Sequence, residues 1–302
     1  MNYKSDIKQY SILFLLPRGK GGVVDLCKML INSLGPDFRS DHLWVASKAR
    51  EFFVKRLFYL LHDTYKLVTR LRNSSYCIIQ LNPSFKIYSL LRDSFYLFII
   101  KRFTDRSKTV VFFHGWNFSL VEKIIDNLFY KKLFWKIYKD VSIIFVFQEH
   151  SKEQLISIGI NPQKIKLTTS MYQCLNDIRE RSSKERDDKL NILFMSRFVK
   201  DKGVGISAKV VKLLVKEGYH NFNFIFAGDG PLFLWLNRFI EKNDLKGHIF
   251  TPGYVEGKEK EEILRKSDIL IFPTWCKEGS PLVLMEAMGA GQAVISTPRG
   301  AI

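Results

Sequence analysis

Two glutamates in the last quarter of the sequence are spaced so that both could face one ligand. Glu278 and Glu286 stand eight positions apart, and Gly279 and Ser280 follow the first of them. The apolar run Ile269–Phe272 predicts a strand, which puts Glu278 in a strand-to-helix turn and Glu286 about two turns into the helix. Free backbone N–H groups at such a helix start suit an anion. A helix cap with a surface charge is the alternative, and the residue types alone leave both interpretations open.

Two cations open the second half of the chain in a comparable setting. Arg197 follows the apolar run Ile192–Met195, and Lys202-Gly203 stands where the next helix is expected. Two cations that converge near a helix N-terminus can bind and neutralise a diphosphate without a metal. The sequence contains no Asp-x-Asp, the motif that holds a metal on a diphosphate, so we expect no metal and no cofactor. Ordinary surface charge is the alternative.

Two glycine-containing turns follow the next two predicted strands, 224–227 and 248–251. Glycine permits a tight turn and the close approach of a backbone to a ligand. A purely structural turn with an aspartate cap explains the first of them equally well. The residues concerned are Gly228, Asp229 and Gly230 in the first turn and Gly253 and Tyr254 in the second.

A glycine-rich loop and a histidine stand at similar places in the first half. Arg18-Gly-Lys-Gly21-Gly22 lies between a predicted strand and a predicted helix. It is no dinucleotide fingerprint, because Val24 occupies a required glycine position, and no P-loop, because Gly-Lys-Ser/Thr is missing. His114 ends the fourth predicted strand, where ligands of parallel α/β sheets bind. A lone histidine is more often a packing residue.

Short apolar runs alternating with amphipathic stretches must position these side chains. Runs rich in Ile, Val and Phe without strict alternation are typical of parallel strands buried on both faces. Helical spacing between them, as in residues 23–34, 232–243 and 258–266, predicts an α/β fold. The predicted strands are Ile12–Leu16, Leu43–Ala46, Cys77–Leu81, Val110–Phe113 and Ile143–Phe147, then Ile192–Met195, Phe224–Ala227, His248–Thr251, Ile269–Phe272 and Ala293–Ser296.

The alternation breaks between Asp177 and Lys189, where ten of thirteen residues are charged. Such a stretch predicts a solvated linker. We therefore predict two Rossmann-like domains, residues 1–173 and 191–302, joined by a charged linker at 174–190. Two such domains would face each other across a cleft between the carboxyl ends of their sheets.

The charge is concentrated in the first domain. Residues 1–173 hold 27 basic and 13 acidic side chains, a net +14 of the chain's +17. The stretch Lys48–Arg72 interleaves seven cations with aromatic and aliphatic residues. This pattern predicts a helix that binds a membrane surface or the acceptor. A helix with a core face and a solvated basic face is the alternative. No nucleic-acid module is visible, the four cysteines form no metal or disulfide pattern, and no apolar run can span a bilayer.

The second half resembles glycosyltransferase family 4, a family of retaining enzymes with the GT-B architecture. The family signature is a glutamate, seven residues and a second glutamate, then an Ala-Met-Ala-like helix and a strand ending in Ser/Thr. Here it corresponds to Glu278–Glu286, Ala287–Gly291 and Ala293–Thr297. Gln292 stands where a proline is usual, a position that packs and does not react. The resemblance is sharp over residues 191–297 and loose in the first domain.

The resemblance implies a role for each matching residue. Glu286 would hold the donor ribose, Glu278 would contact the transferred sugar, and His114 would be the active-site histidine. Arg197 and Lys202 match the family's phosphate-binding pair. The turn of Gly279, Ser280, Pro281 and Leu282 would approach the sugar diphosphate, the turns of Gly228 and Asp229 and of Gly253 and Tyr254 would line the nucleotide pocket, and the loop of Gly21 and Gly22 would face the donor phosphate and the acceptor.

These observations predict a retaining, metal-independent hexosyltransferase that moves a sugar from a nucleotide diphosphate to an acceptor hydroxyl. The expected setting is bacterial surface polysaccharide or lipopolysaccharide synthesis, with a glycan or lipid-linked glycan acceptor. We expect a cytoplasmic protein, peripheral on an anionic inner-membrane surface, that binds no nucleic acid. A donor-binding, non-catalytic remnant and a basic nucleic-acid-binding protein are the alternatives. The family continues beyond the strand at 293–296, so the second domain is expected to be incomplete.

Overall fold

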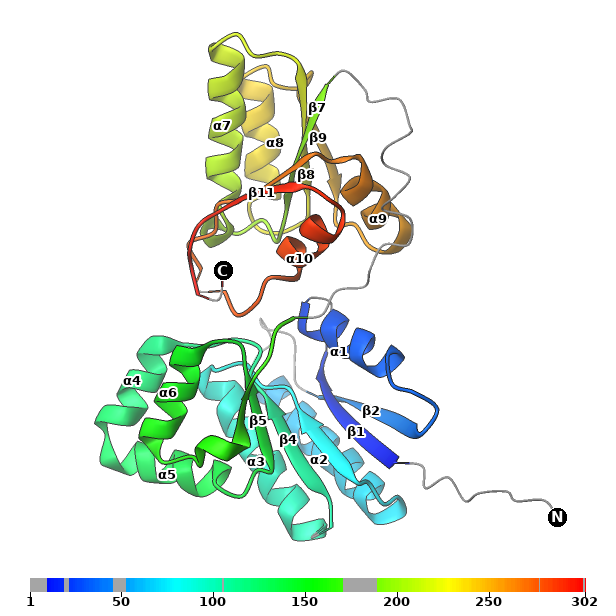
Figure 1. The fold of residues 1–302 in the computed structure, drawn as a ribbon, viewed down its shortest axis with the longest axis vertical. Helices are drawn as coiled ribbons and strands as arrows, with labels where there is room; N and C mark the ends of the chain where they lie inside the picture. The colour runs from blue at the N-terminus through cyan, green and yellow to red at the C-terminus, as the bar shows by residue number, and fades with distance from the viewer. Residues whose placement is uncertain are drawn as a thin grey trace, which may run out of the picture. The chain divides into compact units, whose positions relative to one another are not determined.

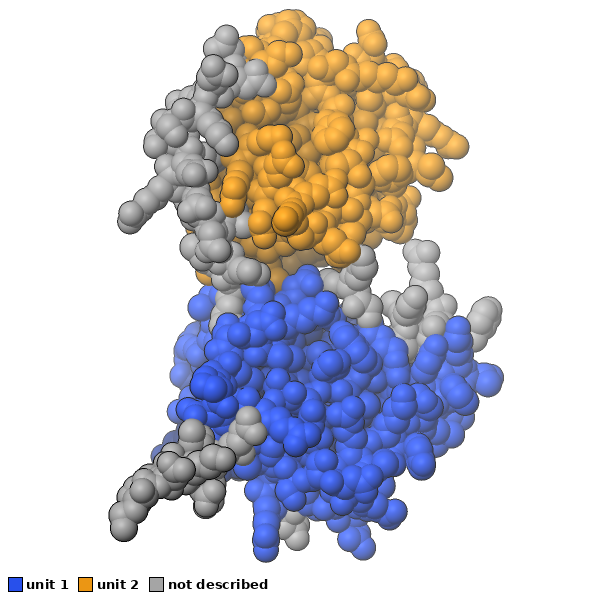
Figure 2. All heavy atoms as spheres, turned by 90° about the vertical axis from the view of Figure 1, so that its right-hand side faces the viewer, with its two compact units in different colours: residues 1–170 blue, residues 171–302 orange. Residues whose placement is uncertain are grey.

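The structure is a computed structural model that describes residues 10–18, 22–45, 53–104, 106–170, 189–276, 278–300 and 302 (Figure 1). It divides into two compact units, residues 1–170 and 171–302 (Figure 2). The predicted linker at 174–190 lies outside the described residues except for its last two positions. The linker and the domain bounds around it therefore stay predictions.

Unit 1 is built on a parallel sheet with the strand order β2-β1-β3-β4-β5-β6. Helices follow the strands in alternation, as the sequence predicts. The strands are β1 Tyr10–Pro17, β2 Phe38–Val45, β3 Ile78–Leu81, β4 Lys108–Phe112, β5 Ile143–Val146 and β6 Ile165–Leu167. The helices are α1 Gly22–Asn32, α2 Phe53–Asn73, α3 Ile87–Phe103, α4 Phe118–Asp126, α5 Leu128–Tyr138 and α6 Glu149–Ile158, with the 3-10 turn η1 at Pro162–Lys164.

Strand β1 of unit 1, which lies between β2 and β3, is apolar on both faces. Leu13 and Leu15 pack into the large core that α2 to α6 close from one side. Ile12, Phe14 and Leu16 point the other way and pack against α1. Burying each such side chain stabilises the fold by about 1.5–3 kcal/mol. This double burial explains why the strands read as continuous apolar runs without polar alternation.

Unit 2 has a second parallel sheet, with the strand order β11-β10-β7-β8-β9. Phe194, Phe224 and Phe226 pack with α7 and α8 on one face, and Leu193 and Leu270 pack with α9 and α10 on the other. The strands are β7 Leu190–Met195, β8 Phe222–Ala227, β9 Ile249–Gly253, β10 Ile269–Phe272 and β11 Ala293–Ser296. The helices are α7 Val204–Lys216, α8 Phe233–Lys242, α9 Gly257–Lys266 and α10 Leu282–Gly289, with the 3-10 turn η3 at Lys200–Lys202.

The strand order reverses once in each sheet, and the reversal marks where a ligand fits. In unit 1 the first strand, β1, lies between β2 and β3, and in unit 2 the first strand, β7, lies between β8 and β10. At such a point the two flanking connections leave on opposite faces and open a crevice outside the carboxyl ends of the strands. The loops after β1 and β3, and those after β7 and β10, therefore hold the residues of interest.

The sequence predictions of an α/β fold and of parallel sheets are confirmed. Each predicted strand overlaps an observed one, and the three-residue edge strand β6 was not predicted. Helix α10 begins at Leu282, so the prediction that Glu286 lies two turns into the helix is wrong, and it lies about one turn in. Pro281 explains the difference, because proline disfavours helical geometry in the residue before it. No described helix is both long and apolar enough to cross a bilayer.

Candidate active site

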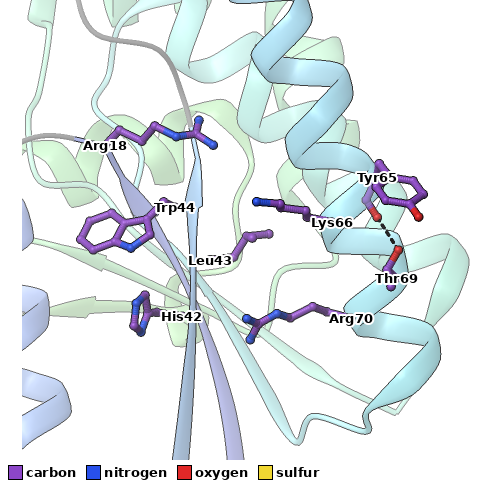
Figure 3. A pocket seen from close by; sticks show the side chains of 8 residues that line it. All are labelled: Arg18, His42, Leu43, Trp44, Tyr65, Lys66, Thr69 and Arg70. Carbon is purple, nitrogen blue, oxygen red and sulfur yellow. Dashed lines mark hydrogen bonds between the residues drawn. The ribbon is translucent and has the colours of Figure 1, made fainter.

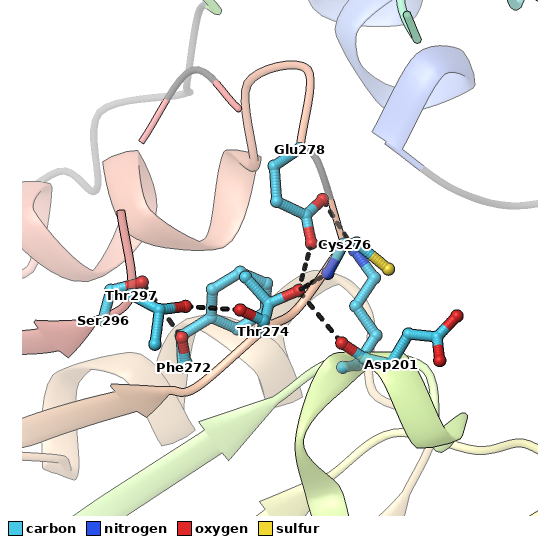
Figure 4. Close-up of polar contacts among 8 residues, drawn as sticks. Asp201, Phe272, Thr274, Cys276, Glu278, Ser296 and Thr297 are labelled. Atoms are coloured by element: carbon cyan, nitrogen blue, oxygen red, sulfur yellow. Dashed lines mark hydrogen bonds and ion pairs between the residues drawn. The ribbon is translucent and has the colours of Figure 1, made fainter. Parts of the chain in front are cut away.

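The site in unit 2 begins with two loops that leave neighbouring strands. The loop after β7 runs through Arg197 to the 3-10 turn at Lys200–Lys202, and the loop after β10 runs from Pro273 to the start of α10. Because β7 and β10 are paired in parallel, both loops leave the same edge of the sheet. The backbone N–H of Trp275 donates to the carbonyl of Asp201 at 2.8 Å and joins the two loops. The Thr274 hydroxyl lies 3.3 Å from the same carbonyl (Figure 4).

A buried ion pair connects the two loops. The Nζ of Lys202 lies 2.5 and 2.7 Å from the two carboxylate oxygens of Glu278, and the side chains are only 15% and 10% exposed. The Thr274 hydroxyl donates to Glu278 Oε1 at 2.6 Å and itself accepts from the backbone N–H of Cys276 at 3.2 Å. Figure 4 shows the carboxylate pointing into this cluster. Glu278 is therefore held as an oriented, charge-compensated acceptor.

The backbone of Glu278 is fixed from the other side by Gly300. The two residues form an isolated parallel bridge. Gly300 has a φ of +72°, and a Cβ on it would lie 2.1 Å from the Glu278 carbonyl oxygen. Thr297 in the same segment donates its hydroxyl to the Thr274 carbonyl. The chain after β11 thus supports the loop that carries the carboxylate.

Gly203 lets the loop after β7 approach the loop after β10 closely. It is the N-cap of α7 with a φ of +85°, and a Cβ there would lie 2.3 Å from the Pro273 carbonyl oxygen. Only glycine combines this left-handed conformation with such an approach. The Lys202-Gly203 sequence therefore does two things: the lysine reaches Glu278, and the glycine lets the loops touch.

Arg197 is placed by a turn after β8. A Cβ on Gly228 would lie 1.9 Å from the Ser196 carbonyl oxygen, and one on Gly230 would lie 2.7 Å from the Phe198 carbonyl oxygen. The Phe198 N–H donates to the Asp229 carbonyl at 2.9 Å. This packing holds the backbone on both sides of Arg197, whose side chain is exposed and forms no ion pair with any residue that the structure describes.

Glu286 is paired in the same manner as Glu278. Its Oε1 lies 2.5 Å from the Nζ of Lys260 on α9, with side chains 14% and 27% exposed. The start of α10, where Pro281 is the N-cap, has no side-chain cap, which leaves helix N–H groups for an anion. Gly253 ends β9 with a φ of +84°, open space around its Cβ position and the exposed Tyr254 beside it.

In unit 1, His114 and Asn82 meet beyond the ends of β4 and β3. His114 Nε2 lies 2.9 Å from Asn82 Oδ1, and the Asn82 amide donates to the Leu15 carbonyl at 3.1 Å. Gln80 donates to the same Asn82 oxygen at 3.0 Å. Burial lowers the pKa of His114 from 6.5 to about 3. The imidazole is therefore neutral at neutral pH, with Nε2–H as the donor to Asn82.

Arg18, at the end of β1, is anchored to a helix. Its guanidinium forms two hydrogen bonds to the fully buried Asp63 of α2, one of them 2.7 Å long, and lies over the ring of Tyr59. Asp63 raises the pKa of Arg18 further. Gly22 is the exposed first residue of α1, and Gly21 lies outside the described residues. The predicted role of this loop stays a prediction.

A cavity of about 730 Å³ lies along the free edge of β2 in unit 1. Figure 3 shows Lys66 and Arg70 reaching from α2 towards His42 and Trp44 on the strand, with Arg18 above them. Cations and aromatic rings dominate this lining, so the cavity is electropositive. It lies beside the strand edge and not at the crevice where His114 and Asn82 meet.

Several residues of the site were not predicted from the sequence. They are Thr274, Gly300 and Lys260 in unit 2 and Asn82 and Asp63 in unit 1. Asn82 carried a usable signal, a polar residue directly after a buried strand. Lys260 carried none, because it sits in a run of alternating Lys and Glu on α9.

Solved structures with the same arrangement define the fold class. A glycosyltransferase from Rickettsia africae matches with a TM-score of 0.65 and 17% identity, over 97% of this chain and 80% of that one. Anabaena HepE in complex with UDP and glucose matches with a TM-score of 0.62 and 15% identity, over 97% and 82%. The fold is that of GT-B glycosyltransferases, with Rossmann-like units.

Sequence comparison identifies the kind of domain in unit 2. Residues 176–302 match the family model described as glycosyl transferases group 1. The putative colanic acid biosynthesis glycosyltransferase WcaL of Salmonella typhimurium is 26% identical over 202 residues, 65% of this chain and 48% of that protein. The amylovoran biosynthesis glycosyltransferase AmsK of Erwinia amylovora is 26% identical over 205 residues, with the same shares. The chain spans about half the length of these relatives.

Lys202→Met is expected to destabilise the protein by about 3 kcal/mol, because it leaves Glu278 as a buried charge without its cation. Adding Glu278→Gln should recover most of that loss, since the glutamine keeps the shape without the charge. Urea unfolding of the single and double variants measures the coupling. A cost below about 0.5 kcal/mol for Lys202→Met would mean that water screens this pair like a surface salt bridge.

Gly228→Ala should lower the free energy of unfolding by more than about 2 kcal/mol, because the new Cβ meets the Ser196 carbonyl and the φ of +147° is strained. Gly218→Ala is the matched control: its φ is +86° but nothing lies within 4 Å of the Cβ position. This variant should lose only about 1–2 kcal/mol of the free energy of unfolding, because an alanine there meets the left-handed conformation but no clash. Equal losses in the two variants would contradict the close approach at Gly228.

The protonation of His114 should make stability depend on pH. The unfolded chain binds a proton at this histidine below about pH 6.5, whereas the folded chain does so only near pH 3. Unfolding therefore takes up a proton in this window, and the free energy of unfolding should fall as the pH is lowered, by up to about 1.4 kcal/mol per pH unit. Urea titrations between about pH 4 and pH 7 should show a shallower slope for His114→Gln than for wild type. The exposed His150→Gln control should follow wild type.

Proposed function

We propose that this chain transfers a sugar from a nucleotide diphosphate to an acceptor hydroxyl, with retention at the anomeric carbon. The observation that carries the proposal is the Lys202–Glu278 pair at the strand-order reversal between β7 and β10, with Arg197 in the same loop as Lys202. The match to glycosyl transferases group 1 and the glycosyltransferase names of the relatives support it. A neighbour of the same fold, HepE, is in complex with UDP and glucose.

The donor diphosphate is assigned to Arg197, Lys202 and the N–H groups at the start of α10. Lys202 is neutralised by Glu278 in the free site, so Arg197 supplies the exposed positive charge. When the diphosphate arrives, Lys202 shares its three donors between phosphate and carboxylate. The Glu278 carboxylate then accepts from a sugar hydroxyl as well. The ion pair thus couples the binding of the phosphate to the orientation of the sugar.

The ribose is assigned to Glu286, whose carboxylate accepts from the two ribose hydroxyls while Lys260 holds it in place. Gly253 and Tyr254 line the base pocket, where the lack of a side chain at Gly253 leaves room for a ring. These assignments use side chains whose charge is already compensated. The nucleotide therefore meets fixed acceptors and not mobile ones, which lowers the entropy lost on binding.

The chemical step breaks the bond between the anomeric carbon and the leaving phosphate oxygen and forms the bond to the acceptor oxygen. The acceptor attacks on the face from which the phosphate leaves, so retention requires no protein nucleophile. The acceptor proton passes to the leaving phosphate, so no protein base is required. Arg197 and Lys202 stabilise the negative charge that grows on the diphosphate, an electrostatic contribution of several kcal/mol in such sites. Neutral His114 keeps its Nε2–H on Asn82, so its Nδ1 can accept from a sugar hydroxyl without adding charge. No step requires a metal.

We assign the binding of the acceptor to unit 1. The acceptor itself would be a growing glycan. The relatives are named for the biosynthesis of colanic acid and amylovoran, which suggests a bacterial polysaccharide. We propose a peripheral location at the inner membrane, where a lipid-linked glycan would be available. A remnant that only binds donor would show nucleotide binding without transfer, and a transfer assay on the 302-residue chain separates the two outcomes.

UDP binding tests the donor site. Glu286→Gln should weaken binding by about 1–3 kcal/mol, roughly 5- to 150-fold, because it loses charged hydrogen bonds to the ribose. The matched control is Glu262→Gln, an exposed glutamate paired with Lys266 on α9, which should bind like wild type. Calorimetry with and without EDTA should give the same affinity. Unchanged binding in Glu286→Gln would remove the ribose assignment, and loss of binding in EDTA would contradict a metal-free site.

A further inference from the structure

The cavity along the free edge of β2, here called the β2–α2 cavity, takes no part in the sugar-transfer chemistry. Its volume of about 730 Å³ lies within the range of small-molecule sites, about 300–1,000 Å³. Among the described strands β2 pairs only with β1, so the outward N–H and C=O groups of β2 border the cavity. The lining side chains are His42, Leu43 and Trp44 from β2, Tyr65, Lys66, Thr69 and Arg70 from α2, and Arg18 (Figure 3).

Two cations share the α2 wall of this cavity. Lys66 and Arg70 lie about one helical turn apart and both reach towards β2 (Figure 3). Among the residues that the structure describes, neither has an ion-pair partner, and the lining contains no carboxylate. Asp41, beside the lining on β2, accepts from the Tyr76 hydroxyl at 2.9 Å and lies 3.9 Å from Arg39. The cavity therefore holds two positive charges without a counter-charge within ion-pair distance.

The cavity begins close to the crevice of unit 1. The backbone N–H of Arg18 donates to the Val45 carbonyl at 3.1 Å, which puts Arg18 where β2 ends. Arg18 is three residues after Leu15, whose carbonyl accepts from the Asn82 amide. The Cα atoms of Leu15 and Arg18 are therefore within about 11 Å of each other. From Arg18 the cavity runs along β2, away from the crevice where His114 and Asn82 meet.

Aromatic rings form the β2 wall of the cavity. His42 and Trp44 occupy alternate positions of β2, and their rings lie edge to face with centroids 5.4 Å apart. Trp44 also packs against the apolar cluster under α1, which holds its ring in place. Flat rings of this kind can pack against the apolar C–H face of a sugar ring, whose hydroxyl groups then need donors and acceptors. The backbone groups at the edge of β2 supply both.

We propose that the β2–α2 cavity binds an anionic sugar unit of the acceptor glycan. The carboxylate or phosphate ester of this unit lies between Lys66 and Arg70, and its ring lies against His42 and Trp44. An inorganic anion would leave the rings without a partner, and a neutral sugar would leave both cations without a counter-charge. The assignment to the acceptor rests on the proposed sugar transfer, whereas the binding does not. The bound unit lies beyond the one that receives the transferred sugar.

Two disaccharides test the charge requirement. Cellobiouronic acid differs from cellobiose by one carboxylate in place of a hydroxymethyl group. In NMR titrations the 302-residue chain should bind the acid at least about tenfold more tightly than cellobiose, the contribution of one charged hydrogen bond. High salt should reduce this difference. Glucose 6-phosphate identifies the source of the charge, because tighter binding of this sugar than of the acid would favour a phosphate ester over a carboxylate.

Variants assign the binding to this cavity. Lys66→Gln with Arg70→Gln should bind the acid about tenfold or more weakly, at the level of cellobiose. The matched control is Lys132→Gln with Lys136→Gln, which removes two exposed cations four residues apart on α5 and should bind like wild type. His42→Ala should weaken the binding of both disaccharides, because it removes a ring that both contact.

Equal affinity of wild type for the two disaccharides, or a Lys66→Gln/Arg70→Gln variant that binds like its control, would overturn the proposal. An oligothymidylate that binds more tightly than the acid, and that this variant no longer binds, would assign the cavity to nucleic acid. UDP binding and sugar transfer are measured on the same samples. Failure of the disaccharide test in a chain that binds UDP would remove this inference alone. A chain that selects the acid but neither binds UDP nor transfers sugar would remove the proposed function and keep the cavity as a binding site.

Discussion

The Lys202–Glu278 ion pair is the contact on which the geometry of unit 2's site depends. Taking two charges out of water costs several kcal/mol per ion, and their attraction offsets this only when the geometry is good and the remaining lone pairs are satisfied. Here Thr274 supplies the third hydrogen bond to the carboxylate. Gly203 and Gly300 let the two loops approach closely enough for the pair to form. The pair therefore orients both loops more than it stabilises the fold.

The same device occurs twice in the site, and it explains how acidic residues can serve an anionic ligand. Glu278 and Glu286 each carry a lysine partner, so the site presents two carboxylates without net negative charge from them. Arg197 then tips the balance towards an anion. In the proposed donor site a diphosphate would meet a cation, while the sugar and ribose hydroxyls would meet fixed acceptors. Because lysines neutralise both carboxylates, the same site could bind an anion and accept hydrogen bonds from hydroxyl groups.

Unit 1 uses its charges differently. Its buried acids, Asp63 and Asp93, are neutralised in internal pairs with Arg18 and Arg92. The net charge of the surface is therefore set by the other residues, among which cations outnumber acids. His114 is kept neutral by burial, and its Nε2–H donates to Asn82. The excess positive charge of the first half therefore lies on the outside of the helices, and the crevice where His114 and Asn82 meet gains no cation from the histidine.

The sequence by itself determined the elements and many residues of the proposed donor site. Runs such as Ile269–Phe272 specify strands because both faces of the sheet must be apolar, whereas the sequence placed the start of α10 too early. Only the tertiary structure decided the partners. Lys202 and Glu278 are 76 residues apart and meet because the strand order puts β7 beside β10. Apolar patterns specify that a strand is buried but not which strand lies next to it, so the pairing, the role of Gly300 and the depressed pKa of His114 could not be predicted.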